Sequence, residues 1–288
     1  MKSKTPSDAQ YLLGRTDREY ERLMDQARWI NPCTEKLFID AGIGPGMCVL
    51  DIGCGVGDVS LLLGKLVGNT GEIVGIDQDG TALAKAEERT KKAGIGRIKF
   101  LQGDFRQLNL QGSFDAIVGR YVLMYQADPV AAVRSITTHL SPTGVVVFQE
   151  LDMTRIPICW PSIPLFEQCF HWARAANLQA GIHVDMGLNL YRTFLAANLT
   201  NVRLRMDNLV GAGPDFQGYR IIAESMRSIL PTLERSKIAT TEEVGADTLE
   251  RRLRAAVVSA NALVIWSPIF GAWGFAPIPS KMQTQHAH

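Results

Sequence analysis

The sequence predicts an α/β fold: a mostly parallel sheet of seven strands with helices on both faces, N-terminal helices before it, and a helical lid inserted after the fifth strand. Two observations lead to this prediction. Short runs of β-branched residues alternate with segments of helical spacing between residues 47 and 151, which is typical of parallel strands covered on both sides by helices. A glycine-rich turn also joins the first of these runs to the first helical segment.

Helices are expected between the strands of this region. Thr81–Ala93 has helical spacing and pairs Glu87 with Lys91 at i,i+4. Asp128-Pro129 places a cap residue before a proline at the first helical position, which predicts the start of another helix. The five expected strands are Cys48–Ile52, Glu72–Asp77, Ile98–Gln102, Phe114–Val118 and Gly144–Glu150.

The flanking segments predict further elements of the same fold. Residues 18–42 are expected to form two helices broken at Asn31-Pro32, and Val202–Val210 has the pattern of a strand. The uncharged Val257–Trp266 is expected to be the strand that closes the sheet. The predicted division is an N-terminal helical cap (1–46), a core (47–153), a helical lid (154–200) and a C-terminal part of the core sheet with added helices (201–288).

Composition and charge narrow the class of protein. The chain has 288 residues, with 30 Lys and Arg against 29 Asp and Glu, a balance that argues against binding nucleic acid through many phosphates. Pro268, Gly271 and Pro277 interrupt the uncharged residues 255–280, so no membrane span is expected. The five cysteines form no CxxC pair and the N-terminus has no apolar signal segment, so we expect a cytoplasmic protein without a bound metal.

The glycine-rich turn, VLDIGCGVGD at residues 49–58, carries the most information about function. Glycines allow a tight turn and let a ligand lie against bare backbone, and the helix behind them presents unpaired N–H groups. A nicotinamide dinucleotide site of the GxGxxG type needs glycine at position 58, where this chain has Asp58. Asp51, just before the turn, suits a ligand with a positive centre and an amino group.

The next strand ends add groups that suit an adenosine. Asp77 ends the second strand, where a carboxylate can accept both hydroxyls of a ribose. Asp104 and Phe105 follow the third strand and place an acceptor for an exocyclic amine beside an aromatic face. Arg120 follows the fourth strand at the edge where such sheets bind ligands, so we expect it near the cofactor, with a solvated surface charge as the alternative.

These motifs together resemble the class I S-adenosylmethionine-dependent methyltransferases, in particular the small-molecule group of ubiquinone/menaquinone-like and natural-product methyltransferases. The resemblance covers residues 10–152 and is ordered: VLDIGCGVG, GIDQD, LQGDF, FDAIVGRYVLMY and LSPTGVVVFQE. It implies a Rossmann-like fold and S-adenosylmethionine as cofactor. It also implies contacts to the methionine moiety from Asp51, Gly53 and Gly55, to the ribose from Asp77, and to the adenine side from Gln78, Gly103, Asp104 and Phe105.

The N-terminal segment adds one more expected cofactor contact. Tyr11, in Tyr11-Leu-Leu-Gly-Arg15, is expected to fold over the carboxylate of the cofactor, and a mobile tail is the alternative.

Methyl transfer from a sulfonium is an in-line displacement, so the enzyme mainly positions a nucleophile and excludes water. A group that removes a proton would be an addition, and Tyr20, Glu150 and His183 are the expected catalytic residues because of their chemistry and their places in the fold. A Tyr20–His183 pair from opposite walls is the preferred base. Each of these residues could instead be structural.

Aromatic residues in and near the lid predict the acceptor. Few charges accompany them, and pockets for aromatic or prenyl-like molecules are lined in this way. We therefore expect methylation of a hydrophobic, aromatic or indole-bearing small molecule in natural-product biosynthesis, with C-methylation favoured. The alternatives are O- or N-methylation of a phenol or quinone, and binding of the cofactor without catalysis; a homodimer is left open. The expected pocket residues are Tyr125, Trp160, Phe170 and Trp172.

Overall fold

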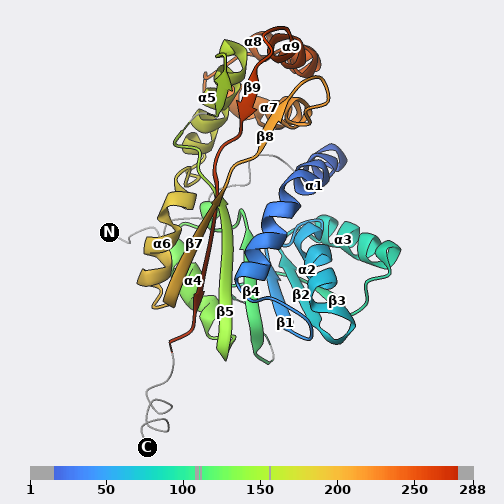
Figure 1. Ribbon diagram of the computed structural model, residues 1–288, viewed down its shortest axis with the longest axis vertical. Helices are drawn as coiled ribbons and strands as arrows, with labels where there is room; N and C mark the ends of the chain where they lie inside the picture. Colours follow the sequence, from blue (N-terminus) through green and yellow to red (C-terminus); the bar gives the residue numbers. More distant parts are fainter. Residues whose placement is uncertain (1–15, 108–109, 111, 156, 278–288) are drawn as a thin grey trace, which may run out of the picture.

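The computed structural model describes residues 16–107, 110, 112–155 and 157–277. Its centre is a seven-stranded sheet in the order β3-β2-β1-β4-β5-β10-β7, in which β10 runs antiparallel to both of its neighbours and the other pairs are parallel (Figure 1). The predicted mostly parallel sheet is confirmed. The strands are β1 Cys48–Ile52, β2 Glu72–Asp77, β3 Ile98–Gln102, β4 Phe114–Arg120, β5 Leu140–Leu151, β7 Thr200–Asp207 and β10 Ile269–Phe275.

Helices cover both faces of this sheet, and others lie beyond its end (Figure 1). A second sheet of three strands, β6-β9-β8, lies beside those other helices. Its strands are β6 Ile158–Trp160, β8 Val210–Ala212 and β9 Leu263–Ile265. The helices are α1 Asp17–Asp40, α2 Asp58–Val67, α3 Gly80–Ala93, α4 Pro129–Thr137, α5 Pro164–Gln179, α6 Met186–Ala196, α7 Gly218–Arg235, α8 Thr241–Val244 and α9 Ala246–Ser259, with 3₁₀ turns at Gly68–Thr70 and Leu123–Tyr125.

The predicted break in the first helix is wrong, because α1 continues through Pro32. Proline removes one helical hydrogen bond and normally kinks or ends a helix. Here residues on both sides of the proline are buried against the rest of the protein: Ile30 is 2% exposed, and Leu37 is fully buried. Packing along the whole length of the helix therefore outweighs the local preference.

The predicted closing strand is also wrong. Val257 lies in α9, and Leu263–Ile265 forms β9 in the small sheet, whereas β10 closes the large sheet. Gly271, which in the sequence served only as an argument against a membrane span, has a packing role in β10. A Cβ at Gly271 would lie 2.5 Å from Leu37 Cδ1, so the glycine lets α1 approach the strand closely.

An accessory layer lies above the carboxyl ends of the parallel strands of the large sheet and consists of α5, α7, α8, α9 and the small sheet (Figure 1). In it α7 packs against α5 and α9 around a separate apolar core. The helix α6 packs instead on β5, β7 and β10. The predicted lid, 154–200, thus contains α5, which belongs to the accessory layer, and α6, which packs on the large sheet. The four-part division of the chain remains a prediction.

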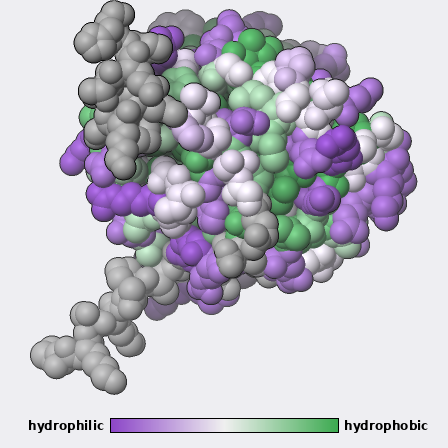
Figure 2. All heavy atoms as spheres, turned by 90° about the horizontal axis from the view of Figure 1, so that it is seen from below, coloured by the Kyte–Doolittle hydropathy of each residue, from purple (hydrophilic) through white to green (hydrophobic). Residues whose placement is uncertain are grey.

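None of the helices in the described part of the chain is long and apolar enough to cross a membrane. The same described residues contain no group of three or more metal-ligating side chains. Seen from the end opposite the accessory layer, purple hydrophilic side chains surround smaller green apolar areas (Figure 2). The apolar side chains that line the candidate ligand site lie at the other end of the sheet.

A substitution of Gly119 in β4 tests how closely the core is packed below the carboxyl ends of the parallel strands. A Cβ at this position would lie 2.5 Å from Phe148 Cε1 and 3.2 Å from Ile52 Cγ1. We expect G119A to lower the free energy of unfolding by about 1–3 kcal/mol, as overpacking of a core does, measured by urea denaturation. G96A is the control, because its Cβ would meet nothing within 4 Å; equal losses in the two variants would contradict this account.

Candidate functional site

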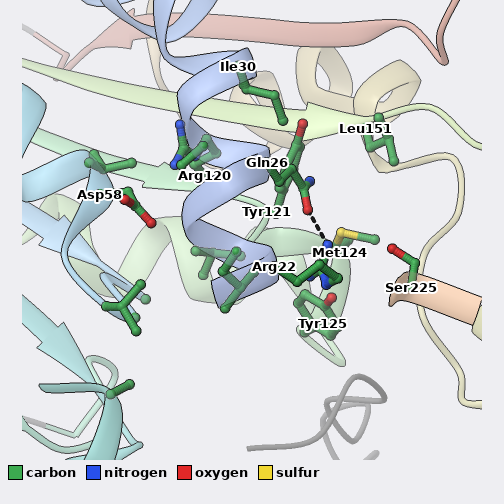
Figure 3. A pocket seen from close by; sticks show the side chains of 18 of the residues that line it. Arg22, Gln26, Ile30, Asp58, Arg120, Tyr121, Met124, Tyr125, Leu151 and Ser225 are labelled. Carbon is green, nitrogen blue, oxygen red and sulfur yellow. Dashed lines mark hydrogen bonds between the residues drawn. The ribbon is translucent and has the colours of Figure 1, made fainter. Parts of the chain in front are cut away.

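One cavity of about 630 Å³ extends from the carboxyl ends of β1, β2 and β4 to the underside of the accessory layer. The helix α1 crosses it, with Arg120 and Asp58 on one side of the helix and Met124, Tyr125 and Ser225 on the other (Figure 3). The first side is called the cofactor end, and the second the acceptor end. Because the two ends belong to one cavity, groups bound at both would lie next to each other.

The glycine loop forms the floor of the cofactor end. Gly53, Gly55 and Gly57 have φ angles of +64°, +51° and +81°, which side-chain-bearing residues rarely adopt. A Cβ at Gly55 would have no atom within 4 Å, and Gly53 and Gly55 both line the cavity. The backbone is therefore open to a ligand at Gly55, and the N-terminus of α2 begins directly after Gly57.

Asp77 lies next to the glycine loop, at the end of β2, and its carboxylate holds the backbone there. Its carboxylate accepts hydrogen bonds from the backbone N–H of Gly55, at 2.8 Å, and from that of Asp79, at 2.9 Å. It lines the cavity at the end of β2, together with the predicted adenine-side residues Gln78, Gly103 and Phe105. The carboxylate thus holds the glycine loop in place and faces the same end of the cavity as the aromatic ring.

Two predicted cofactor contacts are not on the cavity wall. Asp51 is 1% exposed and accepts a hydrogen bond from Ser60 Oγ at 2.6 Å, and burial raises its pKa to about 7. Asp104 forms an ion pair with Arg106 at 2.5 Å, which holds the pKa of this carboxyl below its usual value. Neither lines the cavity, so the structure does not support direct contact through these carboxylates.

Arg120 provides a positive charge at the cofactor end. Its Nη1 donates to Asn31 Oδ1 at 2.8 Å and to Thr34 Oγ1 at 3.1 Å, both from α1. Within the described part of the chain it has no carboxylate in an ion pair, and burial lowers its pKa. The predicted position near the cofactor agrees with its place on the cavity wall. Tyr11, the other predicted contact of this kind, lies outside the described residues.

The predicted Tyr20–His183 pair is not formed. Tyr20 lines the cavity, and its hydroxyl donates to Asp79 Oδ2 at 2.7 Å. His183 does not line the cavity; its Nε2 lies 3.0 Å from the carbonyl oxygen of Gln126, and its backbone N–H donates to Met124 O. These hydrogen bonds hold the two side chains against different segments.

Glu150, the third predicted catalytic residue, is fully buried in β5 and does not line the cavity. Its Oε1 accepts hydrogen bonds from the backbone N–H of Val122 at 2.9 Å and of Leu123 at 2.7 Å, and Oε2 has no partner among the described residues. Burial raises its pKa to about 8. In this position the side chain stabilises the turn after β4, which carries Tyr121 at a φ of +58°.

Only two of the four predicted aromatic pocket residues line the cavity. Tyr125 and Phe170 line the cavity. The pocket positions predicted for Trp160 and Trp172 are wrong, because Trp160 is 77% exposed on β6 and Trp172 is buried in the core of the accessory layer. Trp266 lines the cavity instead, and its ring centroid lies 5.2 Å from that of Phe170.

The sequence-based prediction missed several polar groups at the acceptor end. Arg22 and Gln26 come from α1, and Gln126 follows the turn after β4. The apolar i,i+3/i+4 spacing of α7 could have indicated a buried face, but not that this face lines a cavity. The α7 residues on the wall are Ile221, Ile222, Ser225, Met226 and Ile229.

The cofactor end fits S-adenosylmethionine. The open backbone at Gly55 leaves room for a ligand against the loop, Asp77 suits ribose hydroxyls, and Phe105 offers an apolar face. Arg120 suits the carboxylate of the methionine moiety. The donor set at this end therefore matches the groups that the cofactor carries.

Comparisons with known proteins agree with this fit. A family model described as a methyltransferase domain matches residues 43–193, more than half of the chain. Demethylmenaquinone methyltransferase of Staphylococcus aureus (strain MRSA252) is 32% identical over 137 residues, which make up 47% of this chain and 53% of that protein. The chain spans about half the length of the curated relatives it matches.

Solved structures show the same fold. The YcgJ protein from Bacillus subtilis has a TM-score of 0.55 at 19% identity, covering 84% of this chain and 97% of that one. A candidate methyltransferase from Bacillus halodurans C-125 also has a TM-score of 0.55, at 14% identity and the same coverage. With the family model and the glycine loop, these similarities establish that the chain belongs to the methyltransferase domain family of class I S-adenosylmethionine-dependent methyltransferases.

Proposed function

We propose that the protein transfers a methyl group from S-adenosylmethionine to an apolar, aromatic small molecule bound at the acceptor end. The observation that carries the proposal is the single cavity, which joins the open glycine loop to a chamber lined by Phe170, Trp266 and apolar residues of α7. Bound S-adenosylmethionine supplies an electrophilic methyl group on a sulfonium sulfur. The chain then has to orient the acceptor against that methyl group and exclude water.

The residues of the acceptor end suit an acceptor that is already nucleophilic. Among the described cavity residues there, burial raises the pKa of the Tyr121 and Tyr125 hydroxyls and of the Cys169 thiol, so these groups stay protonated near neutral pH. An electron-rich aromatic carbon, as in an indole or a phenol, needs no strong base for attack, which favours C-methylation of a natural product.

A quinone in its reduced, hydroquinone form is the second candidate acceptor. The observation that favours it is the 32% identity to a protein whose name makes demethylmenaquinone its substrate. The apolar walls would accommodate such a ring as well as an indole.

The proposal is tested first by calorimetry with S-adenosylmethionine and, separately, with nicotinamide dinucleotides. We expect binding of the former alone; tighter binding of a dinucleotide would overturn the assignment. A radiolabelled methyl donor is then supplied with indoles, phenols and reduced quinones. Transfer to one class identifies the acceptor, whereas cofactor binding without transfer to any of them favours a binding protein without catalysis.

A further inference from the structure

The acceptor end is apolar apart from a small set of uncharged or internally paired polar groups. Arg22 brings a positive charge there, but its guanidinium binds Glu19 with two hydrogen bonds of 2.7 and 2.8 Å. Both side chains are almost completely buried, and Ser228 Oγ also donates to Glu19 at 3.0 Å. Since the pair is neutral as a unit, the described residues of the acceptor end offer no uncompensated charge for a charged ligand, whose desolvation would be costly.

The same arginine determines which way the amide of Gln26 faces. Arg22 Nη1 donates to Gln26 Oε1 at 2.5 Å, one helical turn along α1 (Figure 3). An arginine can only donate, so the oxygen of the amide must face Arg22 and the nitrogen must face away from it. Gln26 lines the cavity, and its Nε2 donates to no described residue. A hydrogen-bond donor is therefore presented from α1.

Gln126, which follows the turn after β4, supplies a hydrogen-bond acceptor instead of a donor. Its Nε2 donates to the carbonyl oxygen of Val122 at 3.3 Å, and its Oε1 is buried without any hydrogen-bond partner among the described residues. The residue is 9% exposed and lines the cavity. A buried acceptor left unpaired costs about 1–3 kcal/mol, which a donor on a ligand would recover.

We infer that the acceptor end selects a neutral aromatic ligand with one hydrogen-bond acceptor, bound by Gln26 Nε2, and one hydrogen-bond donor, bound by Gln126 Oε1. The inference rests on the proposed function and deepens it by naming the substrate class: a hydroxy- or N–H-bearing aromatic that also has a carbonyl oxygen. Apolar walls bind the ring, and the two glutamines determine its orientation against the methyl donor.

Four related indoles test the two contacts separately. Indole-3-carbaldehyde has both groups, 3-methylindole lacks the carbonyl, 1-methylindole-3-carbaldehyde lacks the donor, and indole-3-carboxylate is charged. Each is titrated by calorimetry into the protein saturated with S-adenosylhomocysteine. We expect the first to bind about tenfold more tightly than each of the others, the effect of one lost hydrogen bond or of a buried charge.

Two variants should then change the preferences in a crossed pattern. Gln26→Leu should abolish the preference over 3-methylindole and keep the preference over the N-methylated probe, and Gln126→Leu should do the reverse. Gln126→Glu retains an oxygen acceptor and should restore the N–H preference. Arg28→Ala, on the exposed side of α1, is the matched control. A general loss of folding cannot produce a crossed pattern.

Three outcomes would overturn the inference. One is equal affinity of the wild-type protein for the neutral probes, including no binding of any of them. The second is a uniform loss in both leucine variants, and the third is tightest binding of the carboxylate. In each case binding of S-adenosylhomocysteine leaves the proposed methyltransferase function intact, whereas failure to bind it contradicts that function separately.

Discussion

Replacing Asp77 by alanine is expected to weaken binding of S-adenosylmethionine about a hundredfold or more. The carboxylate accepts the backbone N–H groups of Gly55 and Asp79, so its loss both releases the glycine loop and removes the proposed acceptor of the ribose hydroxyls. Hydrogen bonds to a charged group contribute about 1.5–3 kcal/mol each. Two of them at the ribose account for an effect of this size, measured as the change in Kd by calorimetry.

Two further variants separate these contributions of Asp77. D77N retains one carbonyl oxygen and should have an intermediate Kd. E72A, at the other end of the same strand, removes an exposed ion pair with Arg97 and should leave the Kd unchanged. Wild-type affinity in D77A would show that this carboxylate has no role in holding the cofactor.

The second large effect is on the pH dependence of stability. Burial raises the pKa of Glu150 from its ordinary 4.5 to about 8. Between these values the folded protein holds a proton that the unfolded chain has released, so the free energy of unfolding falls as the pH rises, by at most about 1.4 kcal/mol per pH unit. The contribution is fully present below pH 4.5 and lost as the pH passes through 8.

E150Q should remove this dependence while keeping an oxygen that accepts from Val122 and Leu123. Urea denaturation at pH 5, 6, 7 and 8 is therefore expected to show the variant gaining stability relative to the wild type at each step. Asp51, whose pKa burial raises to about 7, has a dependence of the same sign that ends about one unit lower, so D51N serves as the comparison. Parallel curves for E150Q and the wild type would show that Glu150 is not protonated in the folded protein.

The parts of the fold that follow from local sequence were predicted well. The bounds expected for the first three strands are those of β1, β2 and β3, and the cap at Asp128 starts α4. The glycine loop and Asp77 also lie where their spacing placed them. Strand periodicity, capping and glycine turns depend on neighbouring residues, which the sequence contains in full.

The predictions that were wrong concern residues whose environment depends on packing between distant segments of the chain. Pro32 does not break α1, because the helix packs along its whole length and its Leu37 lies close to Gly271 of β10. The aromatic wall included Trp160 and Trp172 because an aromatic residue looks the same in a sequence whether it is exposed, buried in a core or facing a ligand. Only the positions of β6 and α5 distinguish these cases.

The sequence by itself determined where the glycine loop, Asp77 and Phe105 meet, since they follow successive strands, and parallel strands bring their carboxyl ends to one edge. It did not distinguish Asp51 and Asp104, which follow the same pattern but do not line the cavity. The tertiary structure alone decided the acceptor end. Arg22 and Gln26 lie about 100 residues from Gln126 and about 200 from the α7 wall. The direction of the Gln26 amide follows from a contact with Arg22 one helical turn away. The meeting of Gln26 with Gln126 in one cavity and the contact of Glu19 with Ser228 depend instead on packing across these separations, which no local sequence pattern predicts.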